Sequence, residues 1–205
     1  MLTLSKKAQK MPASPIRKLV PYADEAKKRG TKVYHLNIGQ PDIISPDQAL
    51  DAVKMNKLTL VEYPNSAGIE SYRKGLAKYY QGIGINVEYT DINITTGGSE
   101  ALQIALAVTC DPDDEVIVME PFYTNYNSFA LQNDVKLVSI TTTIDTGFAL
   151  PSVEEFEKKI TPKTKGIILC NPANPTGVLY PKESIEKLGE VAKKHGLYIY
   201  SDEVY

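Results

Sequence analysis

Residues 165–177, with the sequence KGIILCNPANPTG, place an apolar run directly before a loop that contains two prolines. A short apolar run bounded by turn residues is typical of a strand that is buried on both faces. From residue 91 onward, similar β-branched runs alternate with amphipathic stretches of helical length. This alternation predicts an α/β fold in which right-handed crossovers build a mostly parallel sheet with helices on both faces.

The individual elements follow from the same pattern. We expect strands at residues 92–95, 115–119, 136–141, 165–170 and 198–201, and helices at 14–30, 45–57, 69–82, 99–109, 123–132, from 152, and at 183–194. Ser152 and Glu155 have the spacing of a capping box, and Gly196 is placed to end the last helix. The region before residue 46 lacks the alternation, which predicts an arm or a second domain.

Composition excludes several classes of protein. The 205 residues include 23 Lys and Arg and 25 Asp and Glu, which gives a net charge of −2, so neither nucleic acid nor a membrane is an expected partner. Cys110 and Cys170 are too few for a disulfide framework and lack the spacing of a zinc site. We expect both cysteines to be buried, reduced thiols. We also expect that the protein has no metal site and that it is soluble and cytoplasmic.

The residues that follow the predicted strands are unusual. In open α/β sheets, ligands bind beyond the carboxyl ends of the strands. Four of the five ends carry such residues: Gly97, Gly98 and Ser99 after the first, Tyr123 after the second, the loop at 171–177 after the fourth, and Asp202 and Glu203 after the fifth.

Each of these features has two interpretations. The glycine turn before Ser99 offers backbone N–H groups and a hydroxyl to a phosphate, or is an ordinary turn with a serine N-cap. Tyr123 covers a flat ring or only packs, and the 171–177 loop presents rigid amides or is a tight crossover turn. Asp202 follows a strand expected to be central and needs a cationic or donor partner if buried, but Glu203 competes for this role. A helix N-cap is the alternative for both carboxylates.

Their convergence on one sheet edge favours a ligand. The ligand should contain a phosphate, a flat ring, an acceptor that faces an amide and a cationic ring atom that faces a carboxylate. Pyridoxal 5′-phosphate has all four.

Five motifs resemble a known family. They are NIGQPD at 37–42, YPNSAG at 63–68, GGSEA at 97–101, NPTG at 174–177 and SDEVY at 201–205. In combination they resemble the class I/II, fold-type I pyridoxal-phosphate-dependent aminotransferases of the aspartate and aromatic type, over residues 16–205. The resemblance implies an N-terminal arm and part of a small domain at 1–45. Residues 46–205 would form an incomplete cofactor-binding large domain of the pyridoxal-phosphate-dependent transferase type.

By this resemblance, Gly98, Ser99 and Glu100 would hold the cofactor phosphate. Tyr63 resembles the tyrosine that reaches the phosphate from the partner subunit of a homodimer. Gly39 resembles the small residue that lies against the carboxylate end of the substrate.

The ring of the cofactor would be held by a second group of residues. Tyr123 resembles the aromatic residue that stacks on the ring. Asn174, also a substrate-binding residue in the family, and Tyr205 would hydrogen-bond the phenolic oxygen. Asp202, rather than Glu203, would pair with the protonated ring nitrogen and keep the ring an electron acceptor.

The resemblance implies an enzyme that transfers an amino group from an amino acid to a 2-oxo acid. In the family, the lysine that forms the Schiff base with the cofactor follows a further strand beyond the segment that matches Tyr205. We therefore expect no catalytic lysine in this chain and an inactive fragment when it stands alone. Two alternatives remain open: another fold-type I enzyme, such as a lyase, decarboxylase or acyl transferase, or a non-catalytic cofactor-binding regulatory module.

Overall fold

The computed structural model of the chain describes residues 2–205 and divides them into two compact units. One unit consists of the residues up to Lys18 together with Thr96–Tyr205, and the other of Leu19–Thr95. The parallel sheet belongs to the first unit.

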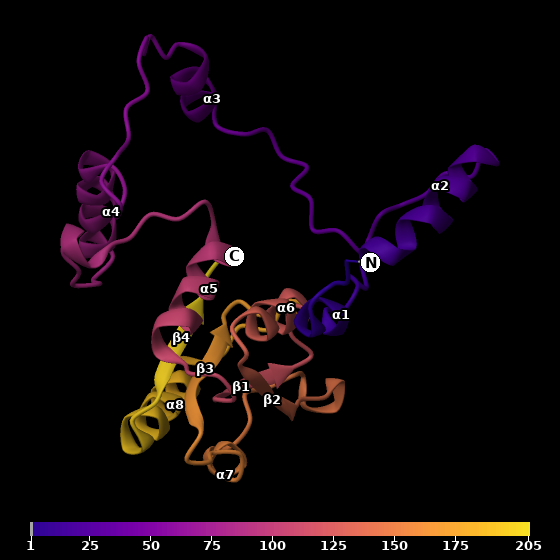
Figure 1. The fold of residues 1–205 in the computed structure, drawn as a ribbon, viewed down its shortest axis with the longest axis vertical. Helices are drawn as coiled ribbons and strands as arrows, with labels where there is room; N and C mark the ends of the chain where they lie inside the picture. Colours follow the sequence, from indigo (N-terminus) through magenta and orange to yellow (C-terminus); the bar gives the residue numbers. More distant parts are fainter. Residues whose placement is uncertain (1) are drawn as a thin grey trace. The chain divides into compact units, whose positions relative to one another are not determined.

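The sheet of the described residues has four strands in the order β2-β1-β3-β4, all paired in parallel (Figure 1). They are β1 (Glu115–Glu120), β2 (Lys136–Thr141), β3 (Thr164–Cys170) and β4 (Tyr198–Asp202). The helices of this unit are α1 (Lys6–Lys10), α5 (Gly98–Thr109), α6 (Asn125–Gln132), α7 (Val153–Glu157) and α8 (Lys182–His195). The predicted fold class, a mostly parallel sheet with helices, is confirmed.

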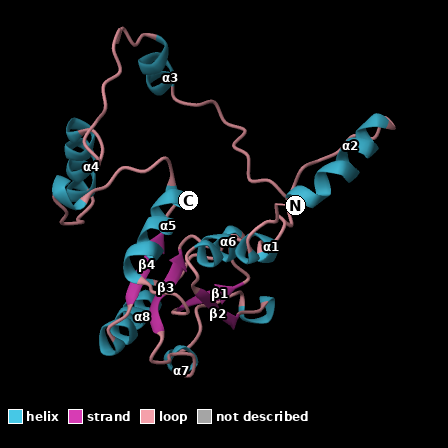
Figure 2. Cartoon of the chain, viewed as in Figure 1, coloured by secondary structure: helices cyan, strands magenta, loops and turns pink. Residues whose placement is uncertain are grey.

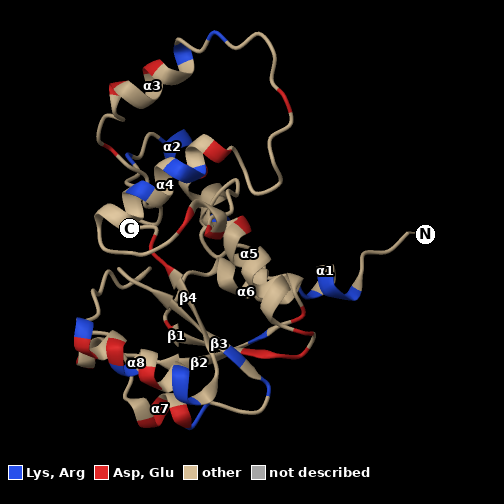
Figure 3. Ribbon diagram, turned by 90° about the vertical axis from the view of Figure 1, so that its left-hand side faces the viewer, with Lys and Arg blue, Asp and Glu red and all other residues tan. Residues whose placement is uncertain are grey.

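Both faces of the sheet are covered, because side chains along a strand point alternately to opposite faces. Val116 and Val118 of β1 pack with Leu106 of α5 and with residues of α6. Ile117 and Met119 pack on the other face in a cluster that includes residues of α7 and α8. Figure 3 shows α5 and α6 on one side of the sheet and α7 and α8 on the other, with the charged residues of α8 along the helix surface.

Two predicted helix ends are confirmed, whereas the helix expected at residues 14–30 is shorter, with a 3₁₀ turn at Arg17–Leu19 before α2 (Val20–Lys28). Ser152 and Glu155 form both hydrogen bonds of a capping box at the start of α7. Gly196 follows α8 in the left-handed conformation, with a φ of 66°, which glycine adopts at little cost.

The predicted strand at residues 92–95 is wrong. After a 3₁₀ turn at Tyr89–Asp91, the chain runs to α5 as a loop (Figure 2). Ile94 donates its backbone N–H to the carbonyl of Ala67 at 2.9 Å, and it lies so close to Gly68 that an added Cβ there would be 2.5 Å from Ile94 Cγ1. The alternation of apolar residues therefore reflects packing on the 65–68 turn, not membership of the sheet.

The last strand, β4, has one partner in this sheet. Among the described residues it pairs with β3 alone, and the central position that we expected for it stays a prediction.

The second unit contains α2 (Val20–Lys28), α3 (Asp47–Lys54) and α4 (Glu70–Gly82). The guanidinium of Arg73, a buried residue of α4, donates to the carbonyls of Gly68 and Tyr89, each at 3.2 Å. It also lies over the Tyr89 ring, 5.4 Å from the centroid. Arg73 thus ties the 65–68 turn and the following 3₁₀ turn to α4.

The first helix, α1, was not expected from the sequence. Ser5 caps it by accepting the N–H of Ala8 at 3.1 Å. Lys7 donates to the carbonyl of Gln132 at 3.0 Å and forms an ion pair with Asp134 at 2.6 Å. These contacts dock the N-terminal segment at the end of α6.

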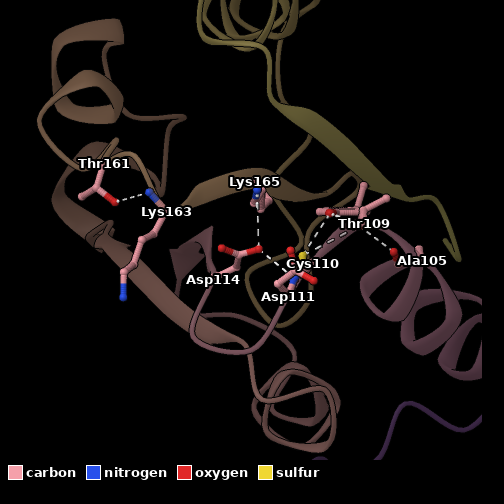
Figure 4. Close-up of polar contacts among 9 residues, drawn as sticks. Ala105, Thr109, Cys110, Asp111, Asp114, Thr161, Lys163 and Lys165 are labelled. Carbon is pink, nitrogen blue, oxygen red and sulfur yellow. Dashed lines mark hydrogen bonds and ion pairs between the residues drawn. The ribbon is translucent and has the colours of Figure 1, made fainter.

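The turns that lead into β1 and β3 are closed by polar contacts (Figure 4). Asp114 accepts the N–H of Asp111 at 2.7 Å and lies 3.7 Å from the Lys165 ammonium.

Cys110, next to this turn, is partly buried, Cys170 is buried, and both are free thiols. No helix within residues 2–205 has the length and apolar character needed to cross a membrane.

Candidate functional site

A cleft of about 210 Å³ opens where β3, β4 and the start of α5 meet. Six residues singled out from the sequence line it, namely Gly98, Ser99, Tyr123, Asn174, Asp202 and Tyr205. They are contributed by a helix N-terminus, two loops, the end of β4 and the segment that follows β4, all within the first unit.

Gly98 and Ser99 form the first turn of α5. The first N–H groups of a helix have no acceptor within it, and the helix dipole makes this end positive. An added Cβ at Gly98 would meet no atom within 4 Å, so the backbone there faces open space. This end of the cleft therefore suits an anion.

Glu100 is placed differently from its two predecessors. Its backbone N–H donates to the carbonyl of Gly97 at 3.1 Å. Its carboxylate accepts the N–H of Thr96 at 2.6 Å, and this hydrogen bond is the main reason why the pKa of Glu100 is lowered. Glu100 is not among the residues that line the cleft.

Tyr123 presents a half-buried aromatic ring on the cleft wall. Its hydroxyl accepts a hydrogen bond from the Asn125 amide at 2.6 Å. Its ring meets that of Tyr126 edge to face, with the centroids 5.5 Å apart and an interplanar angle of 90°. The two contacts fix the plane of the Tyr123 ring.

Asn174 and Tyr205 are hydrogen-bonded to each other, with the Asn174 amide nitrogen 2.7 Å from the Tyr205 hydroxyl. The loop that carries Asn174 is held by a bond from the Gly177 N–H to the Ala173 carbonyl at 2.7 Å. The N–H of Tyr180 donates to the Asn171 side chain at 2.9 Å. The amide is thus presented from a braced loop, and the phenol reaches it from the segment that follows β4.

Asp202, the last residue of β4, is half-buried and lines the cleft. Its Oδ2 accepts a hydrogen bond from the Tyr126 hydroxyl at 2.5 Å. The neighbouring Glu203 is exposed and accepts a bond from the Ser201 hydroxyl at 2.6 Å. The two adjacent carboxylates therefore have different surroundings.

Gly39 and Tyr63 belong to the unit of residues 19–95. Gly39 lies in an exposed loop, and the side chain of Tyr63 is fully exposed. Their proposed roles toward substrate and partner subunit stay predictions.

Sequence reasoning missed several residues of the cleft. Tyr126 and Cys170 contribute polar groups, and the apolar side chains of Leu102, Phe129 and Val204 complete the lining. Tyr126 follows Tyr123 by three residues, a spacing that places both on one face of a helical turn, and this was the available signal. Within residues 2–205, no cluster of His, Cys, Asp and Glu could hold a metal ion.

Comparisons with known proteins agree with this arrangement. Residues 31–205 match the family described as aminotransferase class I and II. The aspartate/prephenate aminotransferase of Thermus thermophilus is 33% identical, a match that covers 100% of this chain and 54% of that protein. Glutamate-pyruvate aminotransferase AlaA of Escherichia coli K12 is 35% identical over 90% of this chain and 47% of its own length.

Solved structures give the same result. The Thermus thermophilus aspartate aminotransferase with maleate has a TM-score of 0.89 and 33% identity. The match covers 100% of this chain and 54% of the chain in that structure. The alanine aminotransferase from Pyrococcus furiosus has a TM-score of 0.89 and 32% identity, with 99% and 52% covered. The chain spans about half the length of the relatives it matches, and the resemblance inferred from the five motifs is confirmed.

Proposed function

The chain belongs to the class I and II aminotransferases, and on this premise we propose that its cleft binds pyridoxal 5′-phosphate for the transfer of an amino group from an amino acid to a 2-oxo acid. The observation that carries the proposal is the meeting of four kinds of group in one cleft. These are a helix N-terminus, an aromatic ring, an amide–phenol pair and a carboxylate.

Each group has a counterpart on the cofactor. We propose that the backbone and hydroxyl of Gly98 and Ser99 bind the phosphate, as the open backbone at the start of α5 suits an anion. The backbone N–H of Glu100 would add to this site only by exchanging its bond to the Gly97 carbonyl. Glu100 is thus the weakest member of the proposed phosphate site.

The opposite end of the cleft suits the ring. Tyr123 offers a flat face, Asn174 and Tyr205 offer hydrogen bonds to the phenolic oxygen, and the Asp202 carboxylate would accept a hydrogen bond from the protonated ring nitrogen. The cofactor, when bound, supplies a ring that accepts electrons from the substrate Cα. The task of Asp202 is to keep the ring nitrogen protonated.

Substrate, assembly and location are further parts of the proposal. Asn174 and Gly39 would contact the amino acid and 2-oxo acid substrates. The exposed hydroxyl of Tyr63 would reach the phosphate of a second copy in a homodimer. The free thiols of Cys110 and Cys170 fit a reducing compartment such as the cytoplasm.

Cofactor binding tests the proposal directly. We expect the purified chain to bind pyridoxal phosphate, inorganic phosphate to compete, and Asp202→Ala to weaken binding about 10- to 100-fold, as hydrogen bonds to charged groups contribute about 1.5–3 kcal/mol. Glu203→Ala, which removes the neighbouring carboxylate, is the matched control and should bind normally. A chain that binds no cofactor, or equal losses in the two variants, would contradict the proposed site.

Covalent attachment is a separate test. No lysine within residues 2–205 lines the cleft, so borohydride reduction of the chain with pyridoxal phosphate should label no single lysine. Stoichiometric labelling of one lysine, located by peptide mapping, would overturn this expectation.

Product analysis on the longest form of the protein that the source organism makes should give one new amino acid per 2-oxo acid formed. Release of ammonia or carbon dioxide instead would favour a lyase or decarboxylase.

A further inference from the structure

The phenol of Tyr126 lies behind the carboxylate that faces the cleft. Tyr126 belongs to α6, its side chain is 1% exposed, and its hydroxyl is 2.5 Å from Asp202 Oδ2. Within residues 2–205, this is the hydrogen bond that reaches the Asp202 carboxylate. A buried side chain 76 positions away in the sequence thus contacts the charged group of the cleft.

The ring of Tyr126 is held on two sides. Phe122 stacks on it with centroids 6.2 Å apart and planes 17° from parallel, and Tyr123 meets it edge to face. Because a ring in such a packed environment does not tilt freely, its hydroxyl has a fixed direction. One side chain therefore contacts both the aromatic wall and the carboxylate of the cleft.

The hydroxyl is a donor throughout the neutral range. Burial is the largest cause of a raised Tyr126 pKa, and the hydrogen bond to Asp202 adds to it. A protonated phenol has one hydrogen to donate, and Asp202 Oδ2 receives it. This bond fixes Oδ2 on the side of Tyr126, while the carboxylate keeps further acceptor positions for a ligand.

We propose that Tyr126 is a positioning residue, which holds the carboxylate of Asp202 in one orientation for the ring nitrogen of the bound cofactor. The proposal rests on the proposed function of the cleft. Without the phenol, a half-exposed carboxylate at the end of β4 would rotate about its side-chain bonds and be solvated by water.

The test compares two ligands that differ at one ring atom: pyridoxamine 5′-phosphate, which needs no lysine to bind, and its analogue with a C–H group in place of the ring nitrogen. The dissociation constant of the analogue, divided by that of pyridoxamine 5′-phosphate, isolates the part of the affinity that depends on the nitrogen. In Tyr126→Phe, which keeps the ring and its packing, we expect the ratio to fall about tenfold, equivalent to about 1.4 kcal/mol, with little change for the analogue.

Tyr200→Phe is the matched control. Tyr200 is also buried, packs in the same cluster and bonds Thr109 at 2.6 Å, but it does not line the cleft. This variant should keep the wild-type ratio. In Asp202→Asn, this ratio should fall because the carboxylate that favours the ring nitrogen is gone. Adding Tyr126→Phe to Asp202→Asn should lower the ratio no further, because a residue that acts through Asp202 has nothing left to position.

The outcomes separate the two proposals. If Tyr126→Phe weakens both ligands equally, or keeps the ratio, Tyr126 is a packing residue and the inference is wrong. If Tyr200→Phe lowers the ratio as much, the effect is one of general stability and the inference also fails. If the unmodified chain binds neither ligand, the proposed function itself is overturned, whereas normal binding with an unaffected ratio in Tyr126→Phe overturns the inference alone.

Discussion

Two neighbouring carboxylates at the end of β4 show how local direction decides a residue's chemistry. Side chains alternate along a strand, so Asp202 turns toward Tyr126 and the cleft, and Glu203 accepts a hydrogen bond from the Ser201 hydroxyl in an exposed position. The donor to Asp202, Tyr126, is buried, whereas the donor to Glu203, Ser201, is exposed to solvent. Chemical identity alone would make them interchangeable.

Buried tyrosines make the stability of the fold sensitive to alkaline pH. Burial is the largest cause of the raised pKa values of Tyr126, Tyr180 and Tyr200. Above pH 10, unfolded chains lose protons that the native state keeps, so these tyrosines stabilise the fold fully below pH 10 and less as the pH rises. We expect the free energy of unfolding to fall by about 1.4 kcal/mol per pH unit for each such tyrosine.

Urea unfolding between pH 8 and pH 11 measures this loss. Tyr126→Phe should reduce the slope by one tyrosine's share, whereas Tyr22→Phe, which changes an exposed tyrosine, should leave it unchanged. The same slope in all three proteins would show that burial of Tyr126 has no part in the effect.

The residues of the cleft were only partly predictable. Asn174 and Asp202 could be placed because each follows a strand that local periodicity predicts. Gly98 and Ser99 could be placed only through the family motif, since the strand predicted before them at residues 92–95 is a loop. Tyr126 could not be assigned to Asp202 in this way. Its hydrogen bond joins residues that are 76 positions apart in the sequence. Such a contact depends on the order of the strands in the sheet, which local sequence does not encode.

At the scale of elements, local signals predicted boundaries well and sheet membership less well. The capping box at Ser152 and the glycine at 196 depend on contacts within a few residues, and both are present. Residues 92–95 have the alternation of a strand, but they pack on the turn at Gly68. Whether an extended segment joins a sheet depends on partners that are distant in the sequence.

Two glycines in regular elements should respond to alanine with opposite signs. In β3, a Cβ on Gly166 would lie 2.6 Å from Tyr200 Cε2 and 2.8 Å from the Tyr198 carbonyl oxygen. Gly166→Ala should therefore destabilise the protein by about 1–3 kcal/mol through overpacking. In α8, a Cβ on Gly189 meets nothing within 4 Å, so Gly189→Ala should stabilise it by about 0.5–1 kcal/mol.

Chemical denaturation of the two variants under identical conditions checks both signs. Because the substitution is the same, each variant serves as the control for the other. A stabilising Gly166→Ala would mean that β3 and β4 are less closely packed at Tyr200 than the structure has them.

At the scale of the whole molecule, the two units differ in how much they bury. Within Leu19–Thr95, the buried residues are Arg73 and Ala77, both in α4. The first unit buries two apolar clusters, one on each face of its sheet. Since local stability follows buried contacts, the units should open with different free energies.

Hydrogen exchange of the 205-residue chain should reveal this difference. We expect the amides of β1 and β3 to exchange slowest, those of α4 at intermediate rates, and those of α2 and α3 fastest. Exchange followed by mass spectrometry of peptides resolves these segments. Equal protection of α3 and β3 would contradict the expected ranking.

The strand order β2-β1-β3-β4 also links completion of the fold to completion of the cleft. Parallel partners are joined only through crossover segments, so every pairing requires the closure of a long loop. Asp202 ends β4 and Asn174 follows β3, so the cleft is complete only where these two strands are paired. A ligand that binds there would therefore favour the paired state by mass action and raise its apparent stability.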